Sequence, residues 1–204
     1  MLQTGLALAV AATSFVAQIP ELPVPPPAVE RKPGPSKPVA GPPILVQYAQ
    51  TGAGRSVTVL LDGKRTKSTY AGVLGFRDAS SAWSSVCADV RAPVAKGQRF
   101  NVRPIAAREL GGNIFKAGAI VAKYVGQVRT ADECAGLQLA VWEAIEDGGE
   151  QANFASGKFA ARAPQAALNF AQQMYLNAKD PGETLYLQAG DGGGQSQLTT
   201  RQAY

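Results

Sequence analysis

The chain has 204 residues and a formal net charge of +5, which suits one folded domain with additional segments. Its basic residues are scattered, so the charge does not indicate a nucleic-acid partner. There is no histidine, which excludes serine–histidine–acid triads, cysteine–histidine nucleophiles and most zinc or copper sites. We therefore expect no metal and no cofactor. The two cysteines permit a single disulfide at most.

Residues 1–17 end in an apolar run, LALAVAATSFVA, of the length found in secretory signal peptides. The run is too short to span a bilayer comfortably. It predicts that 1–17 are a signal peptide or an N-terminal anchor, and that the protein is secreted or lies at the cell surface. Contact with a membrane is expected only through this segment, if it stays uncleaved.

Residues 18–43 are predicted to be a proline-rich stalk, because ten of the fourteen prolines lie between Pro20 and Pro43. Proline fixes φ and removes a hydrogen-bond donor, so the segment should be an extended, semi-rigid polyproline spacer. The folded module is expected to occupy 44–204.

The first half of that module has the composition of strands. Asp62-Gly63 follows the second strand and predicts a tight turn, and Pro104 indicates an edge strand. The predicted strands are 44–50, 56–61, 69–76, 84–90 and 100–105.

The strongest local signal is a helix from Thr130 to Asp147. Thr130 and Glu133 are spaced as a capping box. Residues at three- and four-residue spacing give the helix one buried face: Cys134, Leu137, Gln138, Val141, Trp142 and Ile145. Gln138 is the polar exception, and a buried carboxamide must be hydrogen-bonded or otherwise engaged.

The remaining pattern completes an α+β fold, in which a helical hairpin is inserted into a β-rich domain. A short helix is expected at 117–125 and another after Pro164. Residues 153–160 are predicted to be a hairpin-like interruption, and 184–188 and 195–200 to be returning strands. The carboxylates near the end of the central helix, Glu143, Glu146 and Asp147, are expected to face solvent.

Three segments together resemble bacterial surface thioester domains of the TQXA type, and a related group of exported proteins that carry a PEP-CTERM sorting tail. They are Cys87-Ala88-Asp89, then Leu137-Gln138-Leu139-Ala140-Val141-Trp142, then Gln195-Ser196-Gln197-Leu198. The resemblance covers roughly residues 44–200, in matching order. Leu137 stands where the TQXA signature has threonine.

The resemblance implies a thioester-domain-like fold and an internal thioester between Cys87 and Gln138, supported by Asp89, Ala140 and Trp142. A thioester carbonyl is an electrophile that an amine on a partner attacks, and burial against Trp142 would exclude water. The implied function is covalent adhesion to an amine-bearing surface protein or ligand, without catalytic turnover.

Two other states of these residues remain open. Cys134 lies one helical turn before Gln138, so Cys87 and Cys134 could form a disulfide in an oxidising compartment. Alternatively, Cys87 and Gln138 are unlinked core residues. In either case the protein would be a non-reactive extracellular structural or matrix module of the same fold.

Overall fold

The structure is a computed structural model that describes residues 40–190 and 193–200. The described residues belong to one compact unit. The predicted signal peptide or anchor at 1–17 and nearly all of the predicted stalk at 18–43 lie outside the described residues. Within them, the first strand begins at Ile44.

Within the described part of the chain, seven antiparallel strands form the sheet. They are β1 (Ile44–Leu61), β2 (Arg65–Arg77), β3 (Ala82–Cys87), β4 (Arg99–Ala106), β5 (Phe159–Arg162), β6 (Leu185–Ala189) and β7 (Gln197–Thr199). Because β1 pairs with both β2 and β4, the order β1-β2-β3-β7-β6-β4 closes on itself. Strand β5 extends the sheet along the C-terminal end of β1.

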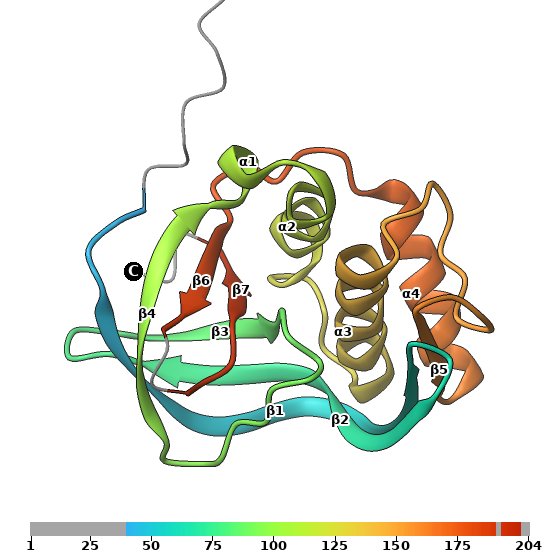
Figure 1. The fold of residues 1–204 in the computed structure, drawn as a ribbon, viewed down its shortest axis with the longest axis horizontal. Coiled ribbons are helices and arrows are strands. Elements are labelled where there is room, and N and C mark those ends of the chain that lie inside the picture. The colour runs from blue at the N-terminus through green and yellow to red at the C-terminus, as the bar shows by residue number, and fades with distance from the viewer. Residues whose placement is uncertain (1–39, 191–192, 201–204) are drawn as a thin grey trace, which may run out of the picture. The chain divides into compact units, whose positions relative to one another are not determined.

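The described residues also form four helices: α1 (Ala107–Leu110), α2 (Gly112–Tyr124), α3 (Ala131–Glu146) and α4 (Gln165–Asn177). In Figure 1 α2, α3 and α4 lie together on one side of the strands, with α3 in the middle. Helix α3 packs against α2 and α4 and against β1, β2 and β3. This mixture of helices with a large antiparallel sheet is compatible with the predicted α+β class. No helix among the described residues is long and apolar enough to span a membrane.

Strand β1 joins two strands that the sequence predicts separately. It pairs with β2 along most of its length, with register shifts between Tyr48 and Gln50 and between Thr51 and Gly54. The tight turn that follows is confirmed, since Asp62 and Gly63 have φ angles of 54° and 64°. Aspartate and glycine are residue types that adopt this left-handed conformation readily.

Several element boundaries differ from the predictions. Strand β4 is flanked by β1 and β6 and is not an edge strand. Pro104 lies past the end of the β1 ladder, where its carbonyl accepts the N–H of Gly41. Strand β5 replaces the end of the expected interruption at 153–160, and α2 begins five residues before the predicted 117.

Helix α3 is buried on nearly every side. Its capping box between Thr130 and Glu133 is confirmed, but residues 134–144 are all buried, so the predicted stripe was too narrow. At Gly136 an added Cβ would lie 2.7 Å from Cβ of Phe170 on α4, which is closer than van der Waals packing allows. The helix is the centre of the core rather than a covering layer.

Candidate functional site

The site begins where β3 leaves its neighbour β2. The β2–β3 ladder ends with Val73 opposite Val86, and the next residue, Cys87, ends β3. The N–H of Ala88 bonds to Ser196 on the β7 side. The backbone N–H and C=O groups of successive residues in a strand point toward opposite neighbouring strands. Since Ala88 bonds on the β7 side, the N–H and C=O of Cys87 point toward β2.

Gln138 of α3 occupies the place that the next β2 residue would take. The N–H of Cys87 donates to Gln138 Oε1 at 2.9 Å, and Gln138 Nε2 donates to the Cys87 carbonyl at 2.8 Å. The Gln138 side chain is 1% exposed. The predicted engagement of this carboxamide is therefore met by the backbone of Cys87, the residue that the thioester hypothesis pairs with it.

The Cys87 sulfur is enclosed by polar contacts. Its thiol donates to the carbonyl of Asp89 at 3.1 Å, and it accepts the Asp89 N–H at 3.3 Å and the Trp142 Nε1–H at 3.4 Å. Burial raises the pKa of the Cys87 thiol to about 12, against the opposing effect of the Trp142 hydrogen bond. The sulfur is consequently a protonated thiol at neutral pH.

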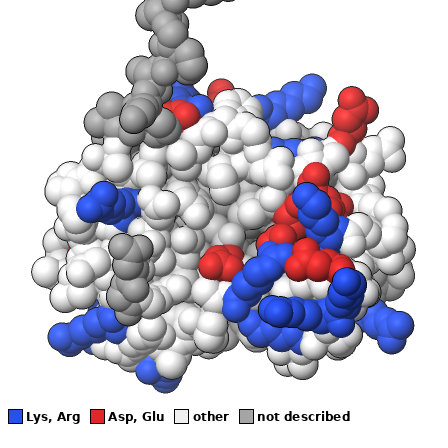
Figure 2. All heavy atoms as spheres, in the orientation of Figure 1, with Lys and Arg blue, Asp and Glu red and all other residues white. Residues whose placement is uncertain are grey.

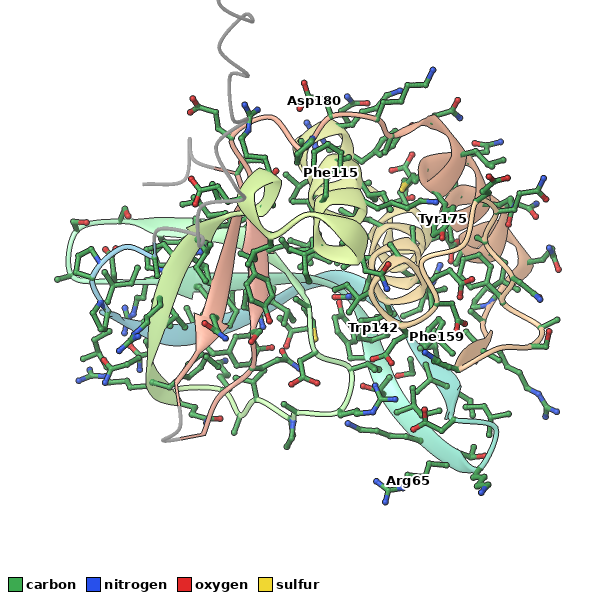
Figure 3. All side chains as sticks on the ribbon, turned by 45° about the horizontal axis from the view of Figure 1, so that its top comes forward. Arg65, Phe115, Trp142, Phe159, Tyr175 and Asp180 are labelled. Carbon is green, nitrogen blue, oxygen red and sulfur yellow. The ribbon has the colours of Figure 1, made fainter. Side chains whose placement is uncertain are left out.

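Trp142 closes the site on the helix side. It lies one turn after Gln138 on α3, is 2% exposed and packs against Phe159 of β5 with ring centroids 6.1 Å apart. Figure 3 shows Trp142 and Phe159 side by side between the helices and the strands. Ala140, for which the family resemblance implies a supporting role, is fully buried in the same helix.

Asp89 shapes the turn after Cys87. Its Oδ1 accepts the N–H groups of Arg91 and Ala92, at 2.9 and 3.1 Å. Gln195 Nε2 donates to the carbonyls of Asp89 and Ala92. We refer to residues 88–92 as the 88–92 turn.

The third sequence motif lies directly behind this turn. Gln197 of β7 donates to Gln195 Oε1 at 2.8 Å and accepts from the hydroxyl of Ser85 at 3.0 Å. All three side chains are buried. Ser85 was missed from sequence because a single serine in a strand carries no signal of its own.

The three motifs quoted for the family resemblance thus meet at one place. Cys87, Asp89, Gln138 and Trp142 are joined by direct hydrogen bonds, and the Gln195 side chain reaches the same turn. Cys134 is buried one turn earlier on α3, and both cysteines are free thiols in the structure. Among the described residues, no three Cys, Asp or Glu side chains gather as metal ligands would.

A buried carboxylate lies further along α3. Glu143 was expected to face solvent but is 1% exposed; Oε1 accepts the Asn153 N–H at 2.8 Å, and Oε2 has no hydrogen-bond partner among the described residues. Asp147 accepts the N–H groups of Lys158 and Phe159. These two side chains hold the segment between α3 and β5, which folds back over the helix end.

Glu143 should make stability depend on pH. Burial raises the pKa of its carboxyl to about 7 from 4.5, partly opposed by the Asn153 hydrogen bond and by Lys116. Because the pKa of this carboxyl is higher in the folded state than in the unfolded state, its contribution to stability is fully present below the unfolded pKa. That contribution is lost as the pH rises through the folded-state pKa of about 7. Glu143→Gln should remove this loss, which amounts to roughly 1–3 kcal/mol, in urea unfolding measured from pH 5 to 8.

Glu150→Gln is the matched control, because Glu150 is an exposed carboxylate in the segment that follows α3. It should leave the pH dependence of unfolding close to that of the parent protein. An unchanged pH dependence in Glu143→Gln would mean that Glu143 is not titrating in the folded state near neutral pH.

Comparison of the chain with protein-family models, with curated proteins and with solved structures gives no match.

Proposed function

We propose that the protein is an exported, surface-displayed module that attaches covalently to amines through an internal thioester between Cys87 and Gln138. The observation that carries the proposal is the direct pairing of the Gln138 carboxamide with the backbone of Cys87 in a buried site. The mixed fold, in which the buried helix α3 packs against the antiparallel sheet and between α2 and α4, is compatible with the α+β class that the resemblance implies.

The chemistry can be written from the groups present. The Cys87 sulfur attacks the Gln138 carboxamide carbon, the C–N bond breaks, and ammonia leaves with the thiol proton. The Cys87 N–H, which already donates to Gln138 Oε1, would stabilise the negative oxygen of the tetrahedral intermediate. An incoming primary amine then forms an amide with the Gln138 carbonyl, and the Cys87 thiol is regenerated.

Burial of the site would prolong the lifetime of such a thioester bond. Cys87 and Gln138 are 2% and 1% exposed, and Trp142 covers the sulfur. Exclusion of water slows hydrolysis of a reactive acyl group. The chain has no histidine to act as a general base for a hydroxyl nucleophile, so amines are the expected partners.

A second candidate is a non-reactive extracellular structural module of the same fold. It is favoured by the fact that the two hydrogen bonds to Cys87 satisfy the buried carboxamide without any covalent link. In that case Gln138 only replaces a missing strand partner, and the cysteines are either free or joined as a Cys87–Cys134 disulfide.

Intact mass of the purified protein tests these candidates. A thioester lowers the mass by one ammonia, and methylamine restores a free Cys87 thiol with incorporation of one methylamine. A disulfide lowers the mass by two hydrogens and responds to reductant, not to amine. Cys134→Ser should keep a thioester and abolish a disulfide.

A mass equal to that of the sequence, with two alkylatable thiols after denaturation, would overturn the thioester. Cys87→Ser serves as the matched control, because it replaces the thiol by a hydroxyl of similar size and should show neither the mass deficit nor the uptake of methylamine.

A further inference from the structure

The site is closed to an incoming amine. Cys87 is 2% exposed and Gln138 1% exposed, so an amine on a partner cannot reach the acyl carbon in the closed structure. The 88–92 turn follows directly on Cys87, and its Val90 side chain is also buried, at 2%. Some part of the enclosure has to move before the partner reacts.

The 88–92 turn is attached differently on its two sides. On the β7 side, Gln195 donates to the carbonyls of Asp89 and Ala92 and is itself held by Gln197. The Gln195 side chain is buried, its two bonds to the turn are part-buried, and its bond with Gln197 is buried. That side is therefore the firmer attachment, about which the turn could pivot.

On the opposite side the turn is held mainly by partly exposed ionic contacts, in which the Glu146 and Asp62 side chains are 14% and 56% exposed. Arg91 Nη1 pairs with Glu146 at the end of α3, and Arg91 Nη2 contacts the Asp62 carboxylate at 3.1 and 3.2 Å. The Arg91 side chain is 42% exposed. Lys67 of β2 adds one bond, from Nζ to the Val90 carbonyl at 3.2 Å.

The Arg91–Glu146 pair lies in line with the reactive residues. Gln138, Trp142 and Glu146 follow one another at four-residue spacing along α3 and so share one side of the helix. Trp142 contacts the Cys87 sulfur, and Glu146, one turn on, contacts the turn that covers it. Separation of the turn from α3 would therefore uncover the sulfur.

We propose that Arg91, through Glu146 and Asp62, clamps the 88–92 turn over Cys87 and Gln138 and sets the rate at which amines reach the acyl carbon. Arg91 is a positioning residue in this scheme and touches no reacting atom. The proposal rests on the proposed function for the identity of the acyl group, whereas the opening of the turn can be measured without it.

The test compares Arg91→Met and Glu146→Gln with the parent protein. Where the intact mass shows a thioester, the readout is the rate of methylamine uptake. Where it shows free thiols, the readout is native-state alkylation of Cys87 by iodoacetamide in a Cys134→Ser background. Either rate should rise roughly three- to fivefold in both variants, the upper part of the effect expected for loss of a partly exposed ion pair.

Ionic strength gives a second readout that a general loss of packing would not reproduce. Exposed ion pairs are screened by salt, so the parent rate should rise as NaCl is increased to about 0.5 M. The Arg91→Met rate should stay nearly flat over the same range. Arg91→Lys, which keeps the charge, should restore most of the parent behaviour.

Arg55→Met is the matched control. Arg55 forms an exposed bidentate pair with Asp132, at 2.8 and 3.1 Å, at the other end of α3. It should leave the rate and its salt dependence unchanged. The proposal is overturned if Arg91→Met reacts within about twofold of the parent, or if Arg55→Met accelerates the reaction equally.

Failure of the proposed function is distinguishable from failure of the clamp. An intact mass without the ammonia deficit removes the thioester, while faster alkylation of Cys87 in Arg91→Met still supports the clamp. A thioester whose aminolysis ignores Arg91 and salt removes only the clamp.

Discussion

Trp142→Ala is expected to lower the free energy of unfolding by roughly 3–5 kcal/mol, as large-to-small changes in a packed core do. Trp142 is 2% exposed, packs against Phe159 and donates its indole N–H to the Cys87 sulfur. Its removal would leave a cavity between α3 and β5 and would uncover the thiol. Urea unfolding monitored by circular dichroism measures the loss.

Trp142→Phe separates packing from the hydrogen bond to sulfur. It retains most of the ring contact with Phe159 but removes the indole N–H, so it should cost clearly less than the alanine variant. Equal losses for the two variants would place the main contribution in the hydrogen bond. A loss below about 1 kcal/mol for Trp142→Ala would contradict the packing described for α3.

The central helix illustrates what local sequence can predict. Thr130 and Glu133 carry a start signal that acts between near neighbours, so the predicted capping box is the one that forms. The position of Gln138 in an apolar stripe indicated a buried, engaged carboxamide, and the structure places it against Cys87. Both inferences depend only on residues that lie close together in the sequence.

Other features depend on pairings distant in sequence. The strand order closes on itself only because β1 pairs with both β2 and β4. Strand β5 forms because residues Phe159–Arg162 pair with the C-terminal end of β1. Glu143 was expected to be solvated because glutamate near a helix end usually is. The segment between α3 and β5 covers it instead, and no helical pattern reports that return of the chain.

The site itself combines both kinds of information. The sequence suggested Cys87, Gln138 and Trp142 through a family pattern, whereas the roles of Gln195, Ser85 and Arg91 arise from the way the 88–92 turn is held. Gln138 acts here as a substitute strand partner, because its amide pairs with both backbone groups of Cys87. That double role makes its substitution informative.

Gln138→Glu is expected to make the fold more sensitive to alkaline conditions than the parent protein. A protonated glutamic acid can accept the Cys87 N–H and donate to the Cys87 carbonyl, as the amide does. An ionised one loses the donor and places a buried negative charge against that carbonyl oxygen. Above the raised native-state pKa the variant should therefore lose roughly 2–4 kcal/mol.

The sign follows from linkage: burial raises the native-state pKa of the new carboxyl above its unfolded value, so stability is retained at low pH and lost as pH rises through the native-state pKa. Urea unfolding between pH 4.5 and 8 measures this as a difference from the parent. Gln138→Leu, which cannot pair with the Cys87 backbone at any pH, should show a loss of stability that does not vary with pH.

Hydrolysis of a thioester would itself leave glutamate at position 138, so a hydrolysed sample should behave as Gln138→Glu does. If Gln138→Glu instead follows the parent at every pH, the carboxamide does not hold the end of β3 to α3, and the geometric basis for pairing it with Cys87 is lost.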